Sequence, residues 1–220
     1  MDKATICARI EEIGIIPAVR LSSTEDALFT AEAVCSSGIP IVEATMTVPG
    51  AMKIIHSLAT KTPDVIVGAG TVLDTETARR CLDAGARFIT TTGLDLEVVD
   101  FAVKQGAVVF PGVLTPTEVI GAWKAGSDFV KVFPCSAVGG PHYIRSLLGP
   151  FPQIRFIAAG GVNQKTVADY ISAGVAAVGI GGDLIHQDAI RRRERDWIRE
   201  LSRQYISIIK QTREERKAAG

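Results

Sequence analysis

Short apolar runs recur along the chain, each followed by turn residues and by a segment in which apolar positions have helical spacing. Several runs are continuously apolar, which is typical of parallel β-strands buried on both faces. Eight strands alternating with helices predict an α/β protein, either a closed (β/α)8 barrel or a doubly wound sheet. The predicted strands are Ile15–Val19, Ile41–Thr45, Val65–Val67, Phe88–Thr91, Val108–Phe110, Phe129–Phe133, Phe156–Ala158 and Ala176–Ile180.

The predicted helices end in a common way. A glycine that can adopt the left-handed conformation closes a helix before the next strand. Thr115 and Glu118, with Pro116 between them, form a capping signal at the start of one helix. The regular length of the units and the absence of an early G-x-G-x-x-G motif favour the (β/α)8 TIM barrel. The closing glycines are Gly38, Gly85, Gly106, Gly126 and Gly174.

The length of 220 residues suits one barrel, and no linker is visible, so we expect a single (β/α)8 domain over residues 1–220. Two extra helices are expected outside the eight units. An N-terminal helix spans residues 3–13, with Ile6, Ile10 and Ile13 on one face. In a C-terminal helix, large apolar residues repeat at helical spacing at Trp197, Leu201, Tyr205 and Ile208.

The composition is that of an ordinary globular protein, with 47% hydrophobic and 22% charged residues. Because the formal net charge is zero, we expect neither nucleic acid nor a membrane as a partner. Arginine clusters near the end of the chain alternate with acidic residues, which favours the solvated face of a packed helix over nucleic-acid binding. We see no secretory signal and no apolar run long enough to span a bilayer.

The cysteines and histidines lack the spacing of a metal site or a disulfide framework. We therefore expect reduced thiols in a cytoplasmic protein, no metal site and no cofactor. The residues concerned are Cys7, Cys35, Cys81, Cys135, His56, His142 and His186.

Two charged residues stand inside predicted buried strands. Lys131 lies in DFVKVFP and Glu43 in IVEATMT. Each has a structural interpretation. Lys131 could extend outward between helices, and Glu43 could form an ion pair with Arg20 or Lys131. Each also has a functional one, because a desolvated amine is a nucleophile toward a carbonyl and a nearby carboxylate can transfer protons. Two inward charges of opposite sign in one barrel favour the functional interpretation.

Other candidate residues follow the strands, where barrel enzymes place their activity. Arg20 ends the first strand and suits an anion ligand. In VGAGTV after the third strand, small residues let a substrate approach the backbone, and Thr71 can bind a carboxylate. Glycine pairs follow the last two strands, where backbone N–H groups commonly bind phosphate in this fold. These pairs are Gly160 with Gly161 and Gly181 with Gly182.

Six segments together resemble the family of 2-keto-3-deoxy-6-phosphogluconate (KDPG) aldolase and 4-hydroxy-2-oxoglutarate aldolase. They are VEATMT, VGAGTV, FPGVLTPTE, KVFPCSAVGGP, AAGGV and GIGGDL, and they run in the family's order from about Ile15 to about Leu184. The VK-x-FP segment is the most specific of these marks. The resemblance implies a metal-free class I aldolase, a homotrimer that cleaves 2-keto-3-deoxy sugar acids to pyruvate and an aldehyde.

The resemblance also implies roles for individual residues. Lys131 matches the family's Schiff-base lysine, Glu43 its acid/base glutamate and Thr71 its carboxylate-binding threonine. The phosphate-binding turns fall on Gly160, Gly161, Gly181 and Gly182. The residues expected to contact substrate are Arg20, Thr47, Gly70, Thr71, Pro111 and Phe133.

Two positions depart from the family's pattern. Thr47 stands where many members carry an arginine that holds substrate anions. The phosphogalactonate branch also lacks that arginine, and the GGPHYIRSL segment is closer to that branch. Asp183 stands where phosphogluconate-type enzymes place a serine, and its carboxylate would repel a phosphate unless it points away.

Three hypotheses about function follow. The first is a Schiff-base aldolase that cleaves a 2-keto-3-deoxy-6-phospho sugar acid, of gluconate or galactonate type, to pyruvate and glyceraldehyde 3-phosphate. The second is an aldolase for unphosphorylated 4-hydroxy-2-oxo acids, or an oxaloacetate decarboxylase, that acts through the same imine. The third is a barrel that binds a phosphorylated metabolite without turning it over.

Overall fold

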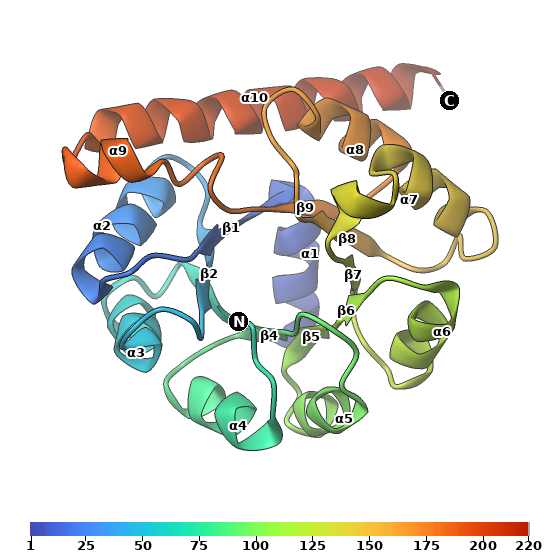
Figure 1. Ribbon diagram of the computed structural model, residues 1–220, viewed down its shortest axis with the longest axis horizontal. Helices are drawn as coiled ribbons and strands as arrows, with labels where there is room; N and C mark the ends of the chain where they lie inside the picture. The colour runs from blue at the N-terminus through green and yellow to red at the C-terminus, as the bar shows by residue number, and fades with distance from the viewer. Residues whose placement is uncertain (220) are drawn as a thin grey trace.

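Parallel β-strands form a ring at the centre of the molecule, and helices surround it (Figure 1). The computed structural model describes residues 1–219. The strands lie in the order β5-β4-β3-β2-β1-β9-β8-β7-β6, and every neighbouring pair is parallel. They are β1 (Ile15–Val19), β2 (Ile41–Thr45), β3 (Ile66–Gly70), β4 (Phe88–Thr90), β5 (Val108–Phe110), β6 (Gly112–Val113), β7 (Val130–Val132), β8 (Phe156–Ala159) and β9 (Ala177–Ile180).

The fifth predicted strand, Val108–Phe110, is confirmed as β5, and after Pro111 the chain forms a further short strand, β6, that was not predicted. β5 pairs with β4 and β6 pairs with β7, so these two consecutive strands nearly close the ring. Pro111 has no N–H to donate to a ladder, but its carbonyl accepts a hydrogen bond of 2.9 Å from the Lys131 N–H. The predicted (β/α)8 barrel is therefore confirmed, with one additional short strand.

The third strand extends further than predicted. Its predicted boundary at Val67 was wrong, because glycines within a strand weaken it and suggest that it ends. In the structure β3 continues through Gly68 to Gly70, and these two residues pair with Glu43 and Thr45 of β2. The two glycines face the same side of β3, since alternate residues of a strand share a face.

Helices alternate with the strands, and the predicted helix ends are confirmed where the structure describes them. Thr115 and Glu118 form a capping box, and the five closing glycines have positive φ. The helices that follow the strands are α2 (Thr24–Cys35), α3 (Ala51–Lys61), α4 (Thr75–Asp83), α5 (Leu96–Lys104), α6 (Pro116–Lys124), α7 (Pro141–Leu148), α8 (Val167–Ala173) and α9 (Gln187–Arg191), with a short 3-10 helix η1 (Cys135–Val138) after β7.

The helix α1 (Lys3–Ile13) runs directly into β1 and contacts β5 and β9. It therefore covers the amino-terminal end of the barrel and lies behind the strands in Figure 1. Ile6 and Ile10 are buried as predicted, while Ile13 is half-buried. The carboxyl-terminal end, which faces the viewer, remains open to solvent.

The helix α10 (Arg195–Ala219) lies along one side of the barrel against α2, α8 and α9 (Figure 1). Its existence is confirmed, but its predicted apolar face was partly wrong. Leu201 and Tyr205 are buried, whereas Trp197 is exposed and Ile208 is half-buried. The buried positions start one residue later, because spacings of three and four residues place Ile198 and Ile209 in line with Tyr205.

Candidate active site

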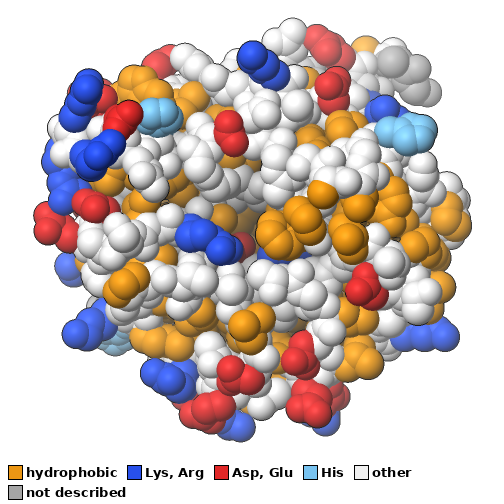
Figure 2. Space-filling view, in the orientation of Figure 1, with side chains coloured by type: hydrophobic (Ala, Val, Ile, Leu, Met, Phe, Trp, Pro, Cys, Tyr) orange, Lys and Arg blue, Asp and Glu red, His pale blue; other side chains and the backbone are white. Residues whose placement is uncertain are grey.

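A cavity of about 370 Å³ opens at the carboxyl-terminal end of the barrel. In Figure 2 the hollow lies near the centre of the visible face, beside blue side chains of Lys or Arg. Nine of the twelve predicted site residues line it, although they come from six different strand ends. They are Arg20, Glu43, Thr71, Lys131, Phe133, Gly160, Gly161, Gly181 and Gly182.

Lys131 occupies the middle of β7, between two buried valines, and only 7% of it is exposed. Its side chain reaches into the cavity, with Nζ 5.4 Å from the centroid of the Phe133 ring. Burial lowers the pKa of the amine below its ordinary value, and the Arg20 charge lowers the pKa further. The nearby Glu43 charge opposes this shift. The amine is therefore closer to its neutral, nucleophilic form than a surface lysine.

Glu43 enters the same cavity from β2 and is also 7% exposed. Burial raises the pKa of its carboxyl group, while the charges of Lys131 and Arg20 lower it. Among residues 1–219, no side chain or backbone group forms a hydrogen bond or ion pair with the carboxylate. A carboxyl group with a raised pKa beside an amine is suited to accept and return protons.

A strip of glycine on the inner face of β3 leaves room for Glu43. A Cβ atom on Gly70 would overlap the Oε1 and Cδ atoms of Glu43 and would lie 2.7 Å from its Cγ. A Cβ atom on Gly68 would overlap the Phe88 ring in the same way. The aromatic ring and the carboxylate therefore occupy successive layers of the barrel where β3 has no side chains. Gly70 does not line the cavity itself but lies beneath the Glu43 carboxylate.

Arg20 and Thr71 meet above this layer. The Arg20 Nη2 atom donates a hydrogen bond of 3.2 Å to the Thr71 hydroxyl. Thr71 has φ of 59°, a left-handed conformation that is unfavourable for a β-branched residue. Such strain is often retained at functional sites. The pair places a guanidinium and a hydroxyl where a carboxylate could accept bonds from both.

The first predicted anion-binding turn, after β8, combines two glycines of positive φ. Gly160 has φ of 84° and Gly161 has φ of 82°. A side chain on Gly161 would overlap the Ser136 side chain of η1, so the turn packs directly on the segment that follows Lys131. Gly181 and Gly182, after the neighbouring strand β9, also line the cavity.

Two other predicted substrate contacts lie outside the cavity. Thr47 is exposed on the turn after β2, where its hydroxyl lies 2.9 Å from the Thr45 hydroxyl. Pro111 is buried between β5 and β6. The cavity also contains Thr92 and Phe110, which were not predicted. Thr92 directly follows the fourth predicted strand, so the criterion that selected Arg20 would have found it.

Within residues 1–219, no group of three or more His, Cys, Asp or Glu side chains could hold a metal ion. None of the helices in this part of the chain is both long and apolar enough to cross a bilayer.

Comparison with known proteins identifies this arrangement. Residues 6–201 match the KDPG and KHG aldolase family. The chain belongs to this family. The 2-dehydro-3-deoxy-phosphogluconate aldolase of Treponema pallidum (strain Nichols) is 32% identical over 206 residues, which cover 93% of this chain and 98% of that relative.

Solved structures of KDPG aldolases agree with the barrel described above. KDPG aldolase from Legionella pneumophila, with pyruvate captured at low pH as a covalent carbinolamine, has a TM-score of 0.83 and 32% identity, covering 89% of this chain and 95% of that one. A native KDPGal structure has a TM-score of 0.84 and 31% identity, covering 91% and 96%. The protein is thus a class I aldolase, a lyase, and the family predicted from the sequence is confirmed. These relatives do not separate the gluconate branch from the galactonate branch.

Proposed function

We propose that this KDPG and KHG aldolase family member cleaves a 2-keto-3-deoxy-6-phospho sugar acid, of gluconate or galactonate type, to pyruvate and glyceraldehyde 3-phosphate. The observation that supports it most is the presence of Lys131 and Glu43, both buried, in one cavity. Taking two charged groups out of water is costly, and a barrel that only binds a metabolite has no need of either. The relatives described above act on, or are named for, substrates of this class.

The proposed reaction begins when the neutral Lys131 amine adds to the C2 carbonyl and water is lost, which leaves a protonated imine. Glu43 removes the proton from the C4 hydroxyl. The C3–C4 bond then breaks, the aldehyde leaves, and the bonding electrons move to the imine nitrogen to form an enamine. Protonation at C3 and hydrolysis of the imine release pyruvate and restore Lys131.

The substrate's two anionic ends would be held on opposite sides of the reacting carbons. The proposed ligands of the carboxylate are Arg20 and Thr71, which are already joined by a hydrogen bond. Phe133 would pack against the pyruvyl carbons. The proposed ligands of the phosphate are backbone N–H groups of the two glycine turns, at Gly160, Gly161, Gly181 and Gly182.

A comparison of substrates tests the phosphate site. We expect kcat/KM for the phosphorylated sugar acid to exceed that for its unphosphorylated counterpart by about 100-fold, because a lost charged anchor costs several kcal/mol. Pyruvate release from each can be followed with a lactate dehydrogenase assay. Equal values would exclude the phosphate site and favour the second hypothesis, 4-hydroxy-2-oxo acids, which Asp183 supports because its carboxylate lines the cavity.

The charges around Lys131 predict opposite pH shifts in two variants. Borohydride trapping of the pyruvate imine should become faster as pH rises through the Lys131 pKa, which burial holds below its ordinary value. Glu43→Gln removes a charge that raises this pKa, so the rise in trapping rate should move to lower pH. Arg20→Met removes a charge that lowers the Lys131 pKa, so the rise in trapping rate should move to higher pH. Shifts in the same direction in both variants would contradict the assignment.

We also propose that the enzyme works as a homotrimer in the cytoplasm. The trimer is what the family resemblance implies, and it is supported by large exposed apolar side chains on neighbouring helices, Leu96 of α5 and Ile120 and Trp123 of α6. The four free cysteines are consistent with a reducing compartment. Light scattering of the intact protein should give the mass of three chains, and a monomeric mass would contradict the proposal.

A further inference from the structure

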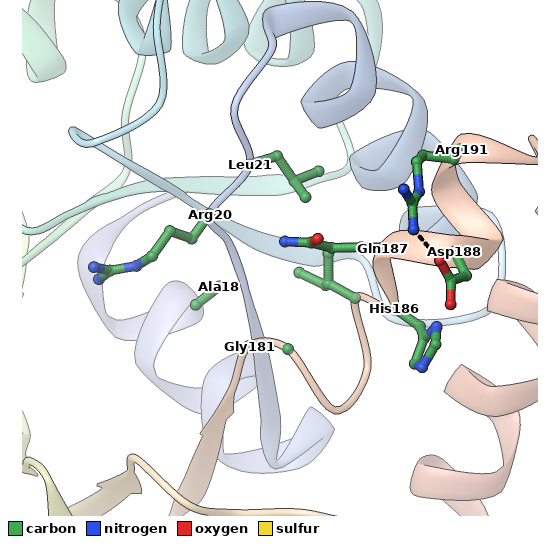
Figure 3. Close-up of a pocket in the computed structure, with 10 residues that line it drawn as sticks. Ala18, Arg20, Leu21, Gly181, His186, Gln187, Asp188 and Arg191 are labelled. Atoms are coloured by element: carbon green, nitrogen blue, oxygen red, sulfur yellow. Dashed lines mark hydrogen bonds and ion pairs between the residues drawn. The ribbon is translucent and has the colours of Figure 1, made fainter.

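A second pocket, of about 410 Å³, adjoins the catalytic cavity (Figure 3). Four residues line both spaces: Ala18, Arg20, Gly181 and Gly182. The pocket then continues between the end of β1 and the start of α9, away from Lys131. Its volume is similar to that of the cavity in which the proposed reaction takes place.

The turn between the two spaces is open because it has no side chains. Gly181 and Gly182 do not have positive φ, so their backbone conformation does not require glycine. In the part of the chain that the structure describes, a Cβ atom on Gly182 would meet no atom within 4 Å, and on Gly181 it would meet only the Ala18 carbonyl oxygen, at 3.8 Å. Larger residues would fit here and narrow the passage. A chain leaving the catalytic cavity can therefore pass over this turn.

The second pocket is suited to a neutral, hydroxylated chain. Figure 3 shows the Gln187 amide pointing across the pocket toward the segment after β1 that carries Arg20 and Leu21. The charged groups that line the pocket already have partners, because Arg191 pairs with Asp188, and Arg20 points away from Gln187 and donates a hydrogen bond to Thr71. An amide donates and accepts hydrogen bonds without preferring an anion. Leu21 and Ile185 supply apolar surface for the carbon chain.

We propose that this pocket binds the distal hydroxylated part of acceptor aldehydes longer than three carbons. The enzyme would then also form and cleave unphosphorylated eight-carbon 2-keto-3-deoxy acids. In the synthetic direction, C3 of the pyruvate enamine attacks the aldehyde carbon of a five-carbon aldose. The aldehyde oxygen gains a proton, and water hydrolyses the imine, so no oxidant or reductant is needed. The proposal rests on the imine chemistry proposed for Lys131.

The test compares two acceptors in the wild-type enzyme and in Gln187→Trp. Pyruvate is condensed with D-glyceraldehyde or with D-arabinose, and the 2-keto-3-deoxy acid formed is quantified. The indole should fill the second pocket, so the ratio of the arabinose rate to the glyceraldehyde rate should fall about tenfold or more. Because each acceptor is compared between two proteins, its own fraction of open-chain aldehyde cancels. The glyceraldehyde reaction also shows that the variant is folded.

Gln105→Trp is the matched control. Gln105 is exposed at the carboxyl end of α5, at the opposite end of the barrel, so this variant should keep the wild-type ratio. An unchanged ratio in Gln187→Trp, or no product from arabinose in a wild-type enzyme that converts glyceraldehyde, would overturn the proposal. Failure of the proposed function would look different, since neither acceptor would react and borohydride would trap no pyruvate.

Discussion

Replacing Lys131 by Met is expected to abolish turnover, with kcat/KM reduced on the order of 10⁴-fold or more. The side chain supplies the nitrogen that would become the imine, and among the residues that line the cavity it is the only amine. Incubation with pyruvate and sodium borohydride should add a reduced pyruvyl group to the wild-type protein. Peptide mapping should locate the group on Lys131, and intact mass should show no addition to the variant.

Stability measurements separate this loss from misfolding. Methionine has a similar length and no charge, so it removes an amine that is costly to bury. We expect the thermal unfolding temperature of Lys131→Met to equal or exceed that of the wild type. The control is Lys124→Met, on the exposed surface of α6, which should keep both the adduct and the activity. A pyruvyl adduct that persists in Lys131→Met would disprove the assignment of the nucleophile.

The sequence predicted the two central residues because each breaks a local rule. A lysine or a glutamate inside an apolar strand has to be explained either by an outward orientation or by function, and the structure places both side chains in one cavity. The same pattern predicted the barrel, since continuous apolar runs separated by helices of regular length permit few arrangements. Boundaries were less certain, as β3 and the additional strand β6 show.

Other features depended on contacts that no local pattern contains. The sequence does not reveal that a carboxylate of β2 rests on a glycine of β3, because that contact arises only when the strands are in register. The predicted contact at Thr47 came from the resemblance to a family in which many members carry an arginine there, yet the shorter threonine side chain does not line the cavity. The second pocket joins residues near 20 with residues near 187, which meet only after the barrel closes.

The contact between Gly70 and Glu43 leads to a second large expected effect. Gly70→Ala should lower kcat by about 100-fold or more, because a misplacement of about 1 Å in a catalytic group can cost that much. The added methyl group would overlap the carboxylate, and within the described residues 1–219 no hydrogen bond holds Glu43 against displacement. Steady-state cleavage kinetics measure the effect. The matched control is Gly93→Ala, where a Cβ atom would meet nothing within 4 Å and activity should be retained.

A double variant shows whether Gly70 acts through Glu43 or only through the stability of β3. If the methyl group displaces the carboxylate, Gly70→Ala should change kcat by less than about twofold when Glu43 is already Gln, because the two changes remove the same contribution. If the methyl group instead distorts the barrel, the two losses should multiply and the unfolding temperature should fall. Multiplicative losses would reject Gly70 as a positioning residue. Strong coupling between the two substitutions would mean that the lack of a side chain at Gly70 of β3 allows the Glu43 carboxylate of β2 to take its position for proton transfer.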